Sequence, residues 1–363
     1  LLFVPQHVSD VGTQTQSITK PCHHQSSTIT GFCGGRQFAE RIKESLMETS
    51  DRANAETQDR LSRTNPAMDV AVAERLLLEV KEVMDRLGVE FFLRQGTCLG
   101  AVRDNAFIPW DDDLDLGVIL EPNGFTQQSI ESVLVAFRQS GYYAQTELSN
   151  SVTLLTALKD NIRIDILFHQ VIREQIYHWP GIWLPARLFY QLKEIPFLGK
   201  TFSVPNPPEE YLRIKYGPNW RTPKRLGYAK DVVDNVPMEP ALGFFARAKR
   251  SLIGSLHPGN VARLRVLDRN GLPICKANVR IVGLGNFKTD KLGYAKLYLQ
   301  KDRYSPGEPT IGLSDPGAIY SIVISYEDHE EVLYEELLAP DKSYVYQPDP
   351  AQTEGRIFVL DQV

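Results

Sequence analysis

The stretch over 107–117 reads Phe-Ile-Pro-Trp-Asp-Asp-Asp-Leu-Asp-Leu-Gly and joins an apolar lead to a cluster of acids. Residues two apart on a β-strand point to the same face. Asp111, Asp113 and Asp115 are therefore predicted to share one face, while Leu114 and Leu116 enter the core on the other. The stretch predicts a buried strand with a carboxylate face.

Three carboxylates on one face repel one another. At a spacing of about 5 Å and an effective dielectric constant of about 20, each pair costs roughly 3 kcal/mol. A hard cation with oxygen ligands neutralises such a face, so Asp111, Asp113 and Asp115 predict a Mg²⁺ or Mn²⁺ site. The alternative is a solvated acidic strand end, because the Asp-x-Asp pattern alone does not separate the two.

A glycine turn precedes this strand and predicts a phosphate site. Gly96 and Thr97 follow the apolar run over 89–93 and lead into a short helix expected over 96–102. Backbone N–H groups at the start of a helix bind phosphate oxygens. Arg103 is expected to add a positive charge to that phosphate, although an arginine on the surface is the common alternative.

A second acidic position lies in the strand predicted over 162–168, which reads Ile-Arg-Ile-Asp-Ile-Leu-Phe. Arg163 and Asp165 share the face opposite the isoleucines. A carboxylate in an apolar strand needs a partner. Asp165 therefore closes the metal site or acts as general base toward an acceptor hydroxyl, and Arg163 is a candidate for binding substrate phosphate. A structural ion pair between the two is the alternative.

The chain has 363 residues, enough for two domains. Residues 1–66 are polar and are predicted to be largely disordered, apart from a polar helix over 37–60. Apolar residues recur at helical spacing from Val72 to Leu87, and Gly88 ends this predicted helix. Strand and helical patterns then alternate, which predicts a mixed-sheet α/β (α+β) catalytic domain over 67–240. A linker is expected over 241–257. Short apolar runs separated by Gly-containing turns predict a small all-β sandwich over 258–363.

The composition argues against two classes of protein. The formal net charge is −5, which gives no electrostatic basis for nucleic-acid binding. No apolar run reaches the ~20 residues of a transmembrane segment. Four scattered cysteines and the absence of Asn-x-Ser/Thr sequons favour a reducing compartment. We therefore expect a cytoplasmic enzyme, and a Golgi enzyme with an N-terminal anchor upstream is the alternative.

Two motifs carry a family resemblance. The segment over 94–103 reads Arg-Gln-Gly-Thr-Cys-Leu-Gly-Ala-Val-Arg, and together with 107–117 it strongly resembles the LicD family, which includes bacterial choline-phosphate transferases and animal fukutin-related proteins. The resemblance covers residues 70–228. A second, downstream signature comprises Pro208-Glu209-Glu210-Tyr211-Leu212, Tyr216-Gly217, Trp220 and Pro223.

The resemblance implies a nucleotidyltransferase-type fold and a reaction. A CDP-activated alcohol would donate phosphocholine, glycerol phosphate or ribitol phosphate to a glycan or glycolipid, such as a precursor of lipopolysaccharide or of a cell-wall polymer. By the same resemblance, Asp113 and Asp115 are the metal pair, Asp165 is the third acid, and Asp111 assists at the rim of the site.

The aromatic residues of the downstream signature are candidates for substrate contact. Tyr211 and Trp220 suit stacking on a base or lining an acceptor groove, and packing of a lid onto the core is the alternative. The chain departs from the family pattern at Cys98, where leucine is usual, and at 104–106, where His-Gly-Gly is frequent. The second departure lies beside the phosphate loop and bears on the identity of the donor.

Two other functions fit the sequence. The same fold and metals serve a nucleotidyltransferase that moves a nucleotide onto a small-molecule hydroxyl. The other function is that of a non-catalytic glycan-binding protein, in which the sandwich binds the glycan. The intact acids Asp113, Asp115 and Asp165 argue against it. The sandwich resembles carboxypeptidase-regulatory or prealbumin-like domains by its pattern, chiefly in the turn over 289–295.

Overall fold

A computed structural model describes residues 50–120, 125–148, 152–237, 261–299, 318–351 and 356–363. The expectations for residues 1–49 and for the linker over 241–257 lie outside the described residues. A helix covers 50–64, overlapping the expected polar helix and continuing past it. Gln58, Leu61 and Ser62 are buried on this helix. Residues 50–64 are therefore packed, in contrast to the largely disordered segment expected over 1–66.

One five-stranded sheet forms the centre of the α/β domain and confirms the mixed α/β expectation. Its order is β1-β2-β5-β4-β3; β2 and β5 run parallel, and the other neighbours are antiparallel. The apolar run predicted as a strand over 89–93 forms only a short strand. The strands are β1 (Phe92–Leu93), β2 (Asp113–Ile119), β3 (Tyr143–Leu148), β4 (Val152–Lys159) and β5 (Ile162–His169).

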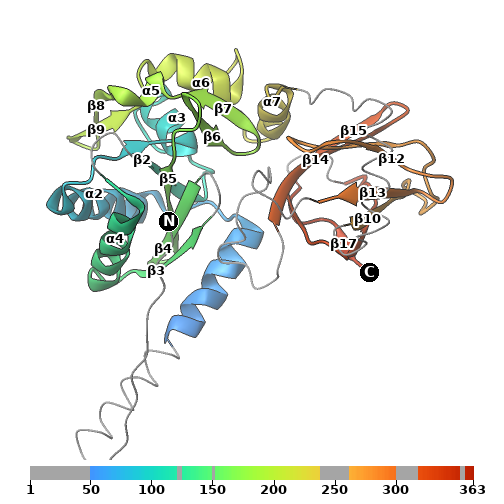
Figure 1. Cartoon of the computed structure of the whole chain (residues 1–363), viewed down its shortest axis with the longest axis horizontal. Helices are drawn as coiled ribbons and strands as arrows, with labels where there is room; N and C mark the ends of the chain where they lie inside the picture. The colour runs from blue at the N-terminus through green and yellow to red at the C-terminus, as the bar shows by residue number, and fades with distance from the viewer. Residues whose placement is uncertain (1–49, 121–124, 149–151, 238–260, 300–317, 352–355) are drawn as a thin grey trace, which may run out of the picture. The chain divides into compact units, whose positions relative to one another are not determined.

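Three helices pack against this sheet, namely α2 (Val70–Leu87), α3 (Gln95–Arg103) and α4 (Gln127–Gln139). Figure 1 shows α2 and α4 next to each other beside the sheet. α2 begins at the N-cap Asp69, whose carboxylate accepts a hydrogen bond from the Val72 N–H, and ends at Gly88 with φ of 65°. Its apolar face, centred on Leu76, Leu77 and Val80, is fully buried. The apolar residues that recur at helical spacing in the sequence form this face.

The aromatic and Pro-rich segment after the sheet also folds onto the core. Tyr211 and Leu212 are fully buried, and Trp220 is nearly so, in the apolar cluster that the sheet and α2 share. The elements are β6 (Gln175–His178), β7 (Ile182–Pro185), α5 (Arg187–Tyr190), β8 (Lys193–Phe197), β9 (Lys200–Val204), α6 (Pro208–Tyr216) and α7 (Tyr228–Asp234).

The C-terminal strands form two four-stranded sheets, in the orders β13-β10-β16-β17 and β12-β11-β14-β15. Alternate residues of both sheets enter one apolar cluster that includes Leu264, Ile281, Leu297 and Ile322. The strands are β10 (Val261–Val266), β11 (Asn278–Ile281), β12 (Gly285–Lys288), β13 (Tyr294–Tyr298), β14 (Ala318–Tyr326), β15 (His329–Leu338), β16 (Ser343–Tyr346) and β17 (Asp361–Gln362).

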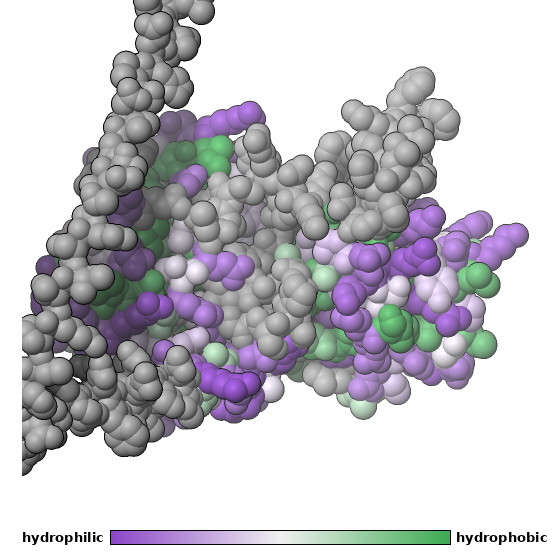
Figure 2. Space-filling view, turned by 60° about the horizontal axis from the view of Figure 1, so that its bottom comes forward, coloured by the Kyte–Doolittle hydropathy of each residue, from purple (hydrophilic) through white to green (hydrophobic). Residues whose placement is uncertain are grey.

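Exposed large apolar side chains are scattered on the described surface, as at Leu226, Leu272 and Leu292. Figure 2 shows mainly hydrophilic side chains among the coloured residues, with smaller hydrophobic areas between them. Among the described residues, none of the helices combines the length and apolar content that crossing a bilayer requires.

Candidate functional site

The pairing of β2 with β5 brings acids from two motifs to one face of the sheet. In the parallel register Asp115 lies opposite Asp165, and Asp113 lies opposite Arg163. Directly opposed residues of neighbouring strands project their side chains to the same face. Leu114 is fully buried on the other face, as strand parity predicts. Asp113, Asp115 and Asp165 thus form one carboxylate face, and Arg163 lies within it.

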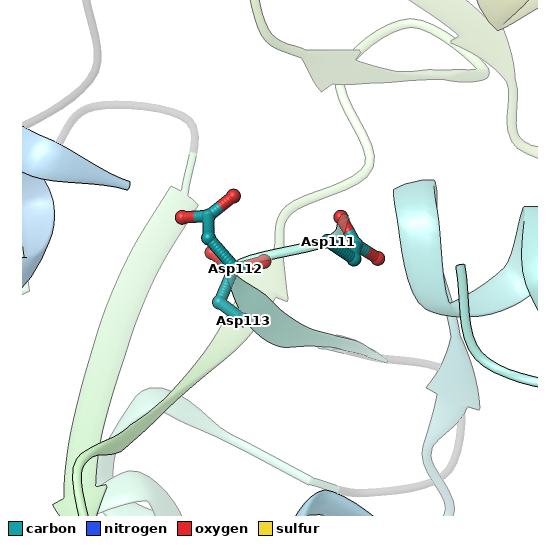
Figure 3. A group of neighbouring side chains, drawn as sticks. All are labelled: Asp111, Asp112 and Asp113. Carbon is teal, nitrogen blue, oxygen red and sulfur yellow. The ribbon is translucent and has the colours of Figure 1, made fainter. Parts of the chain in front are cut away.

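Asp111 and Asp112 reach this face from the segment just before β2. The strand begins at Asp113, so Asp111 does not belong to its carboxylate face by strand parity, and that expectation is wrong. Asp111, Asp112 and Asp113 nevertheless offer carboxylate oxygens that all lie within 4.8 Å of one another. Figure 3 shows Asp111 turned toward α3. Strand parity excluded Asp112 from the predicted site, because it treats residues 111–115 as one regular strand with alternating faces.

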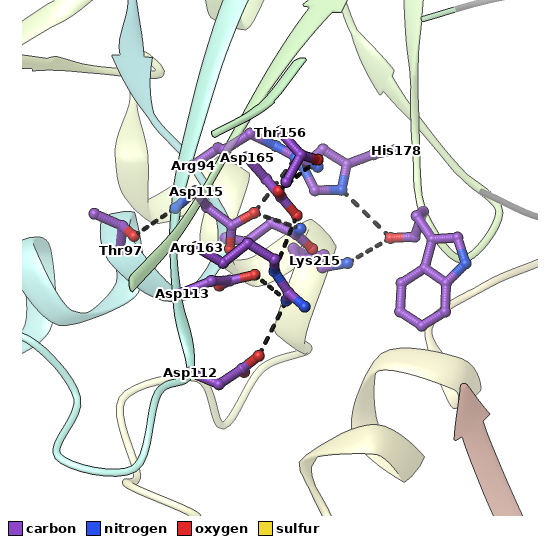
Figure 4. A network of polar contacts seen from close by, with 12 residues as sticks. Arg94, Thr97, Asp112, Asp113, Asp115, Thr156, Arg163, Asp165, His178 and Lys215 are labelled. Atoms are coloured by element: carbon purple, nitrogen blue, oxygen red, sulfur yellow. Dashed lines mark hydrogen bonds and ion pairs between the residues drawn. The ribbon is translucent and has the colours of Figure 1, made fainter. Parts of the chain in front are cut away.

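Arg163 is the hub of the ion pairs at this face (Figure 4). Its guanidinium donates to Asp112 at 3.0 Å and to Asp113 at a short distance, and its Nε lies 3.5 Å from Asp165. Burial acts to lower the pKa of Arg163, but the charges of Asp113, Asp165 and Asp112 outweigh burial and raise the pKa well above its usual value, so the guanidinium is charged. The structural Arg163–Asp165 pair considered from the sequence is therefore present, as part of a larger cluster.

Asp115 is held from three sides. Gln95 Nε2 donates to its carboxylate at 2.9 Å, Arg94 Nη1 lies 3.4 Å away, and the Asp115 N–H donates to the Thr97 hydroxyl at 2.9 Å. Burial and the Asp113 charge raise the pKa of Asp115 to about 7, although Arg94 and Gln95 oppose that shift. Sequence reasoning assigned no role to Arg94 or Gln95.

Burial and the Asp113 charge also raise the pKa of both Asp111 and Asp112 well above the usual range. Asp165 accepts a hydrogen bond from the Thr156 hydroxyl on β4 at 3.0 Å. The cluster thus concentrates negative charge in a largely buried space, where each added charge is costly.

The glycine at the start of α3 lies against the acids. A Cβ at Gly96 would lie 2.7 Å from Asp111 Oδ1, closer than van der Waals contact allows. The N–H groups of a first helical turn have no partner within the helix. At Gln95 this group donates to the Tyr211 hydroxyl at 2.9 Å, and His178 Nε2 lies 3.1 Å from the same hydroxyl.

Two predicted substrate contacts are corrected by these positions. Thr97 is fully buried, and its hydroxyl is taken by the backbone of Asp115 rather than turned toward a phosphate. Tyr211 is also fully buried and ties α6 to α3, which corresponds to the packing alternative. Cys98 is fully buried, and burial strongly raises the pKa of its thiol. It therefore packs in the core as a small neutral residue.

A cavity of about 820 Å³ opens in front of the carboxylates. Arg103 and Trp220 are among its lining residues; Arg103 pairs with Asp104 at 2.6 Å, so its charge is already partly compensated. Tyr334 and Glu335 of β15 also line the cavity, and burial raises the pKa of Glu335. Further basic side chains at this cavity are Lys224, Arg225 and Arg356.

The donor set suits a hard divalent cation. Its atoms are carboxylate oxygens, and the buried Asp111 Oδ2 accepts no hydrogen bond from the described residues. Arg94 and Arg163 supply two positive charges beside the five carboxyl groups of Asp111, Asp112, Asp113, Asp115 and Asp165. The residues therefore fit a Mg²⁺ or Mn²⁺ ion.

Comparison with known proteins gives a family for the α/β domain. The description "LicD/FKTN/FKRP, nucleotidyltransferase domain" matches residues 88–207. The chain is 28% identical over 163 residues to the human "Ribitol-5-phosphate transferase FKTN", covering 42% of this chain and 33% of that protein. It is 37% identical over 151 residues to the uncharacterized protein RT0683 of Rickettsia typhi, covering 40% of this chain and 45% of that protein.

Among solved structures, the antibiotic-resistance factor ANT(2'')-Ia matches with a TM-score of 0.31 and 14% identity, over 52% of this chain and 97% of that one. The chain spans about a third of the length of the FKTN protein that it matches. The matched segment contains Gly96, both strand acids of β2, Arg163 and Asp165. Over residues 88–207, the chain therefore matches the nucleotidyltransferase domain of the LicD/FKTN/FKRP family.

Proposed function

We propose that this protein is a divalent-metal-dependent phosphotransferase that moves an alcohol phosphate from a CDP-activated donor to a hydroxyl of a glycan or glycolipid. The observation that carries the proposal is the register of β2 and β5, which places Asp113, Asp115 and Asp165 on one face of a polar cavity. Acids converging on a cavity are the recurrent arrangement for metal-assisted phosphoryl transfer.

The proposed role of each acid follows from its position. Asp113 and Asp115, the two acids of β2, would hold the cation, and Asp111 and Asp112 would assist at its rim, since the carboxylate oxygens of Asp111 and Asp112 lie within 4.8 Å of Asp113. A bound Mg²⁺ or Mn²⁺ would offset negative charge on the donor's pyrophosphate and on the departing CMP. Arg103 and Trp220 line the cavity and are proposed to contact the donor.

Asp165 is the proposed proton acceptor. The acceptor oxygen forms a bond to the phosphorus that carries the alcohol, the bond from that phosphorus to CMP breaks, and the hydroxyl proton passes to Asp165. The Thr156 hydroxyl, which donates to Asp165 Oδ1, orients the carboxylate. Arg163 Nε lies 3.5 Å from the Asp165 carboxylate and favours its ionised form. This ion pair must therefore loosen before Asp165 can accept a proton.

Ribitol phosphate is the first donor group to test. The human relative is named a ribitol-5-phosphate transferase and is 28% identical to the chain over 163 residues. CDP-ribitol is therefore the leading donor, with CDP-glycerol and CDP-choline as the other alcohol phosphates that the same cavity would present to the acids.

A nucleotidyltransferase is the second candidate, and the family description itself favours it. The two reactions differ in the group transferred: a nucleotide monophosphate in one case and an alcohol phosphate in the other. Mass spectrometry of the acceptor product separates them, because the added masses differ.

The proposal predicts that Asp113→Asn and Asp115→Asn each reduce CMP release from CDP-ribitol by about a hundredfold or more, as removal of a group that stabilises transition-state charge does. CMP would be measured by chromatography with Mn²⁺ and candidate glycans. Asp160→Asn is the matched control, since Asp160 is exposed and pairs with Arg75 away from the cavity. Release at the wild-type rate by both site variants would refute the proposal.

A further inference from the structure

We propose that Arg163 is an internal counter-cation that holds the acidic cluster together without metal, competes with the divalent ion for Asp112 and Asp113, and is drawn away by donor phosphate. The inference rests on the proposed function for the identity of that phosphate, but the competition concerns this chain's own residues. It makes metal binding and nucleotide binding interdependent.

The contacts of Arg163 place a full positive charge where the cation is needed. The guanidinium donates to Asp112 at 3.0 Å and to Asp113 at a shorter distance, and both acids belong to the group whose oxygens lie within 4.8 Å of one another. Its third acidic neighbour is Asp165, at 3.5 Å. Arg163 therefore touches acids on both strands of the site.

This arginine is anchored rather than free to swing in solvent. Its side chain is 14% exposed, and Nη1 donates to the Ser62 hydroxyl at 3.1 Å, on the helix over 50–64. A buried charge that loses its partners is strongly destabilising. The guanidinium leaves the acids only if another anion replaces them.

Competition follows from electrostatics. An Asp113 oxygen that accepts from the guanidinium has fewer lone pairs for a metal, and a cation bound among the same carboxylates repels the guanidinium. Metal affinity without nucleotide is therefore lower than the acids alone would give. A site with Arg163 removed gains one unit of net negative charge and binds a divalent ion more tightly.

A phosphate in the cavity provides the replacement anion. Arg163 itself lines the cavity, and a planar guanidinium binds phosphate oxygens with two parallel hydrogen bonds. A diphosphate that engages Arg163 releases the acids for the metal, and the metal in turn releases Arg163 for the diphosphate. By linkage, each ligand raises the affinity for the other by the same factor.

The test is calorimetric titration of Mn²⁺ into the metal-free full chain, with and without CDP. Arg163→Gln is expected to bind Mn²⁺ about tenfold more tightly than wild type without CDP, and Arg163→Lys to lie between them, because lysine keeps the charge without the fork. CDP should raise Mn²⁺ affinity clearly in wild type and much less in Arg163→Gln. Arg75→Gln, which removes an exposed charge elsewhere, should match wild type.

Mn²⁺ binding by Arg163→Gln that equals wild type or is weaker overturns the inference, as does an equal effect of CDP on both proteins. If Arg163→Gln does not fold alone, Mn²⁺ should restore its folded signal in a melting experiment, and no restoration counts against the inference. The proposed function fails separately: tighter Mn²⁺ binding with no CMP release from any CDP-alcohol supports the counter-cation but not the transferase.

Discussion

Gly96 sets how closely α3 approaches the acids. The place that a Cβ would take is already occupied by the Asp111 carboxylate, and a residue of any other type must push that carboxylate aside. The glycine is thus required by the close contact rather than by its backbone angles. Asp111 carries the buried oxygen without a hydrogen-bond donor among the described residues, so a shift here reaches the cation site directly.

Gly96→Ala is therefore expected to lower CMP release at least tenfold and to weaken Mn²⁺ binding, while the fold persists because alanine favours the helix by about 1 kcal/mol. Calorimetry and circular dichroism would measure the two properties. Val102→Ala, on the same helix but outside the cavity lining, is the control. Unchanged Mn²⁺ affinity in Gly96→Ala would contradict this account of Asp111.

At the scale of elements, a buried hydroxyl links α3 to the backbone of β2. Thr97 on α3 accepts the hydrogen bond of the Asp115 N–H on β2. An unsatisfied buried N–H costs about 1–3 kcal/mol. The hydroxyl is therefore structural, although its place in a glycine turn made it resemble a phosphate ligand.

Thr97→Val removes this acceptor at nearly constant shape, and we expect the free energy of unfolding to fall by about 1–3 kcal/mol. Urea denaturation followed by fluorescence would measure it. Thr97→Ser keeps the hydroxyl and should lose much less. Equal stability of the valine and serine variants would show that Asp115 finds another acceptor.

Local patterns predicted the elements better than the contacts between them. Helical spacing over 72–87 identified α2, and strand parity correctly placed Asp113 and Asp115 on one face. The place where β2 starts depends on its pairing with β1 and β5, so parity misplaced Asp111 and passed over Asp112. The opposition of Asp115 and Asp165 depends on strand register, which neither strand's own sequence specifies.

At the scale of the whole molecule, buried carboxyls make stability depend on pH. Burial raises the pKa of Asp115 to about 7 and that of Glu336 on β15 to about 8. Between the unfolded and folded pKa values of such groups, the folded state binds more protons, so stability falls as pH rises. His169 and His178 have pKa values lowered well below 6.5 by burial, so their effect lies on the acid side.

The metal-free protein, kept in chelator, should therefore lose stability between pH 6.5 and 8.5. Asp115→Asn removes one of the groups responsible and should show a shallower decline, as should wild type with saturating Mn²⁺ bound to the ionised acids. Urea midpoints at a series of pH values would measure this. A rise in stability with pH over that window would contradict the assignment of raised pKa values.

The change from helix-containing to all-strand elements along the chain was accessible from the spacing of apolar residues and turns, because it occurs along the sequence itself. The contribution of the C-terminal strands to the cavity lining was not accessible. Glu335 of β15 reaches the same cavity as Asp113, and no local pattern links a strand of the C-terminal sheets to the acidic motif. The compartment and the acceptor glycan stay predictions.

The Tyr211 hydroxyl has a bearing on where this domain can be divided. It belongs to α6, which starts one position past the residues 88–207 that match the family description, yet it accepts the hydrogen bond of the Gln95 N–H beside Gly96. A boundary drawn by similarity at residue 207 would thus sever the bond that seats the start of α3. A chimera that moves this site into another protein must therefore include α6. The hydrogen bond between the Gln95 N–H and the Tyr211 hydroxyl, and not the motif alone, sets the smallest segment that keeps α3 in place.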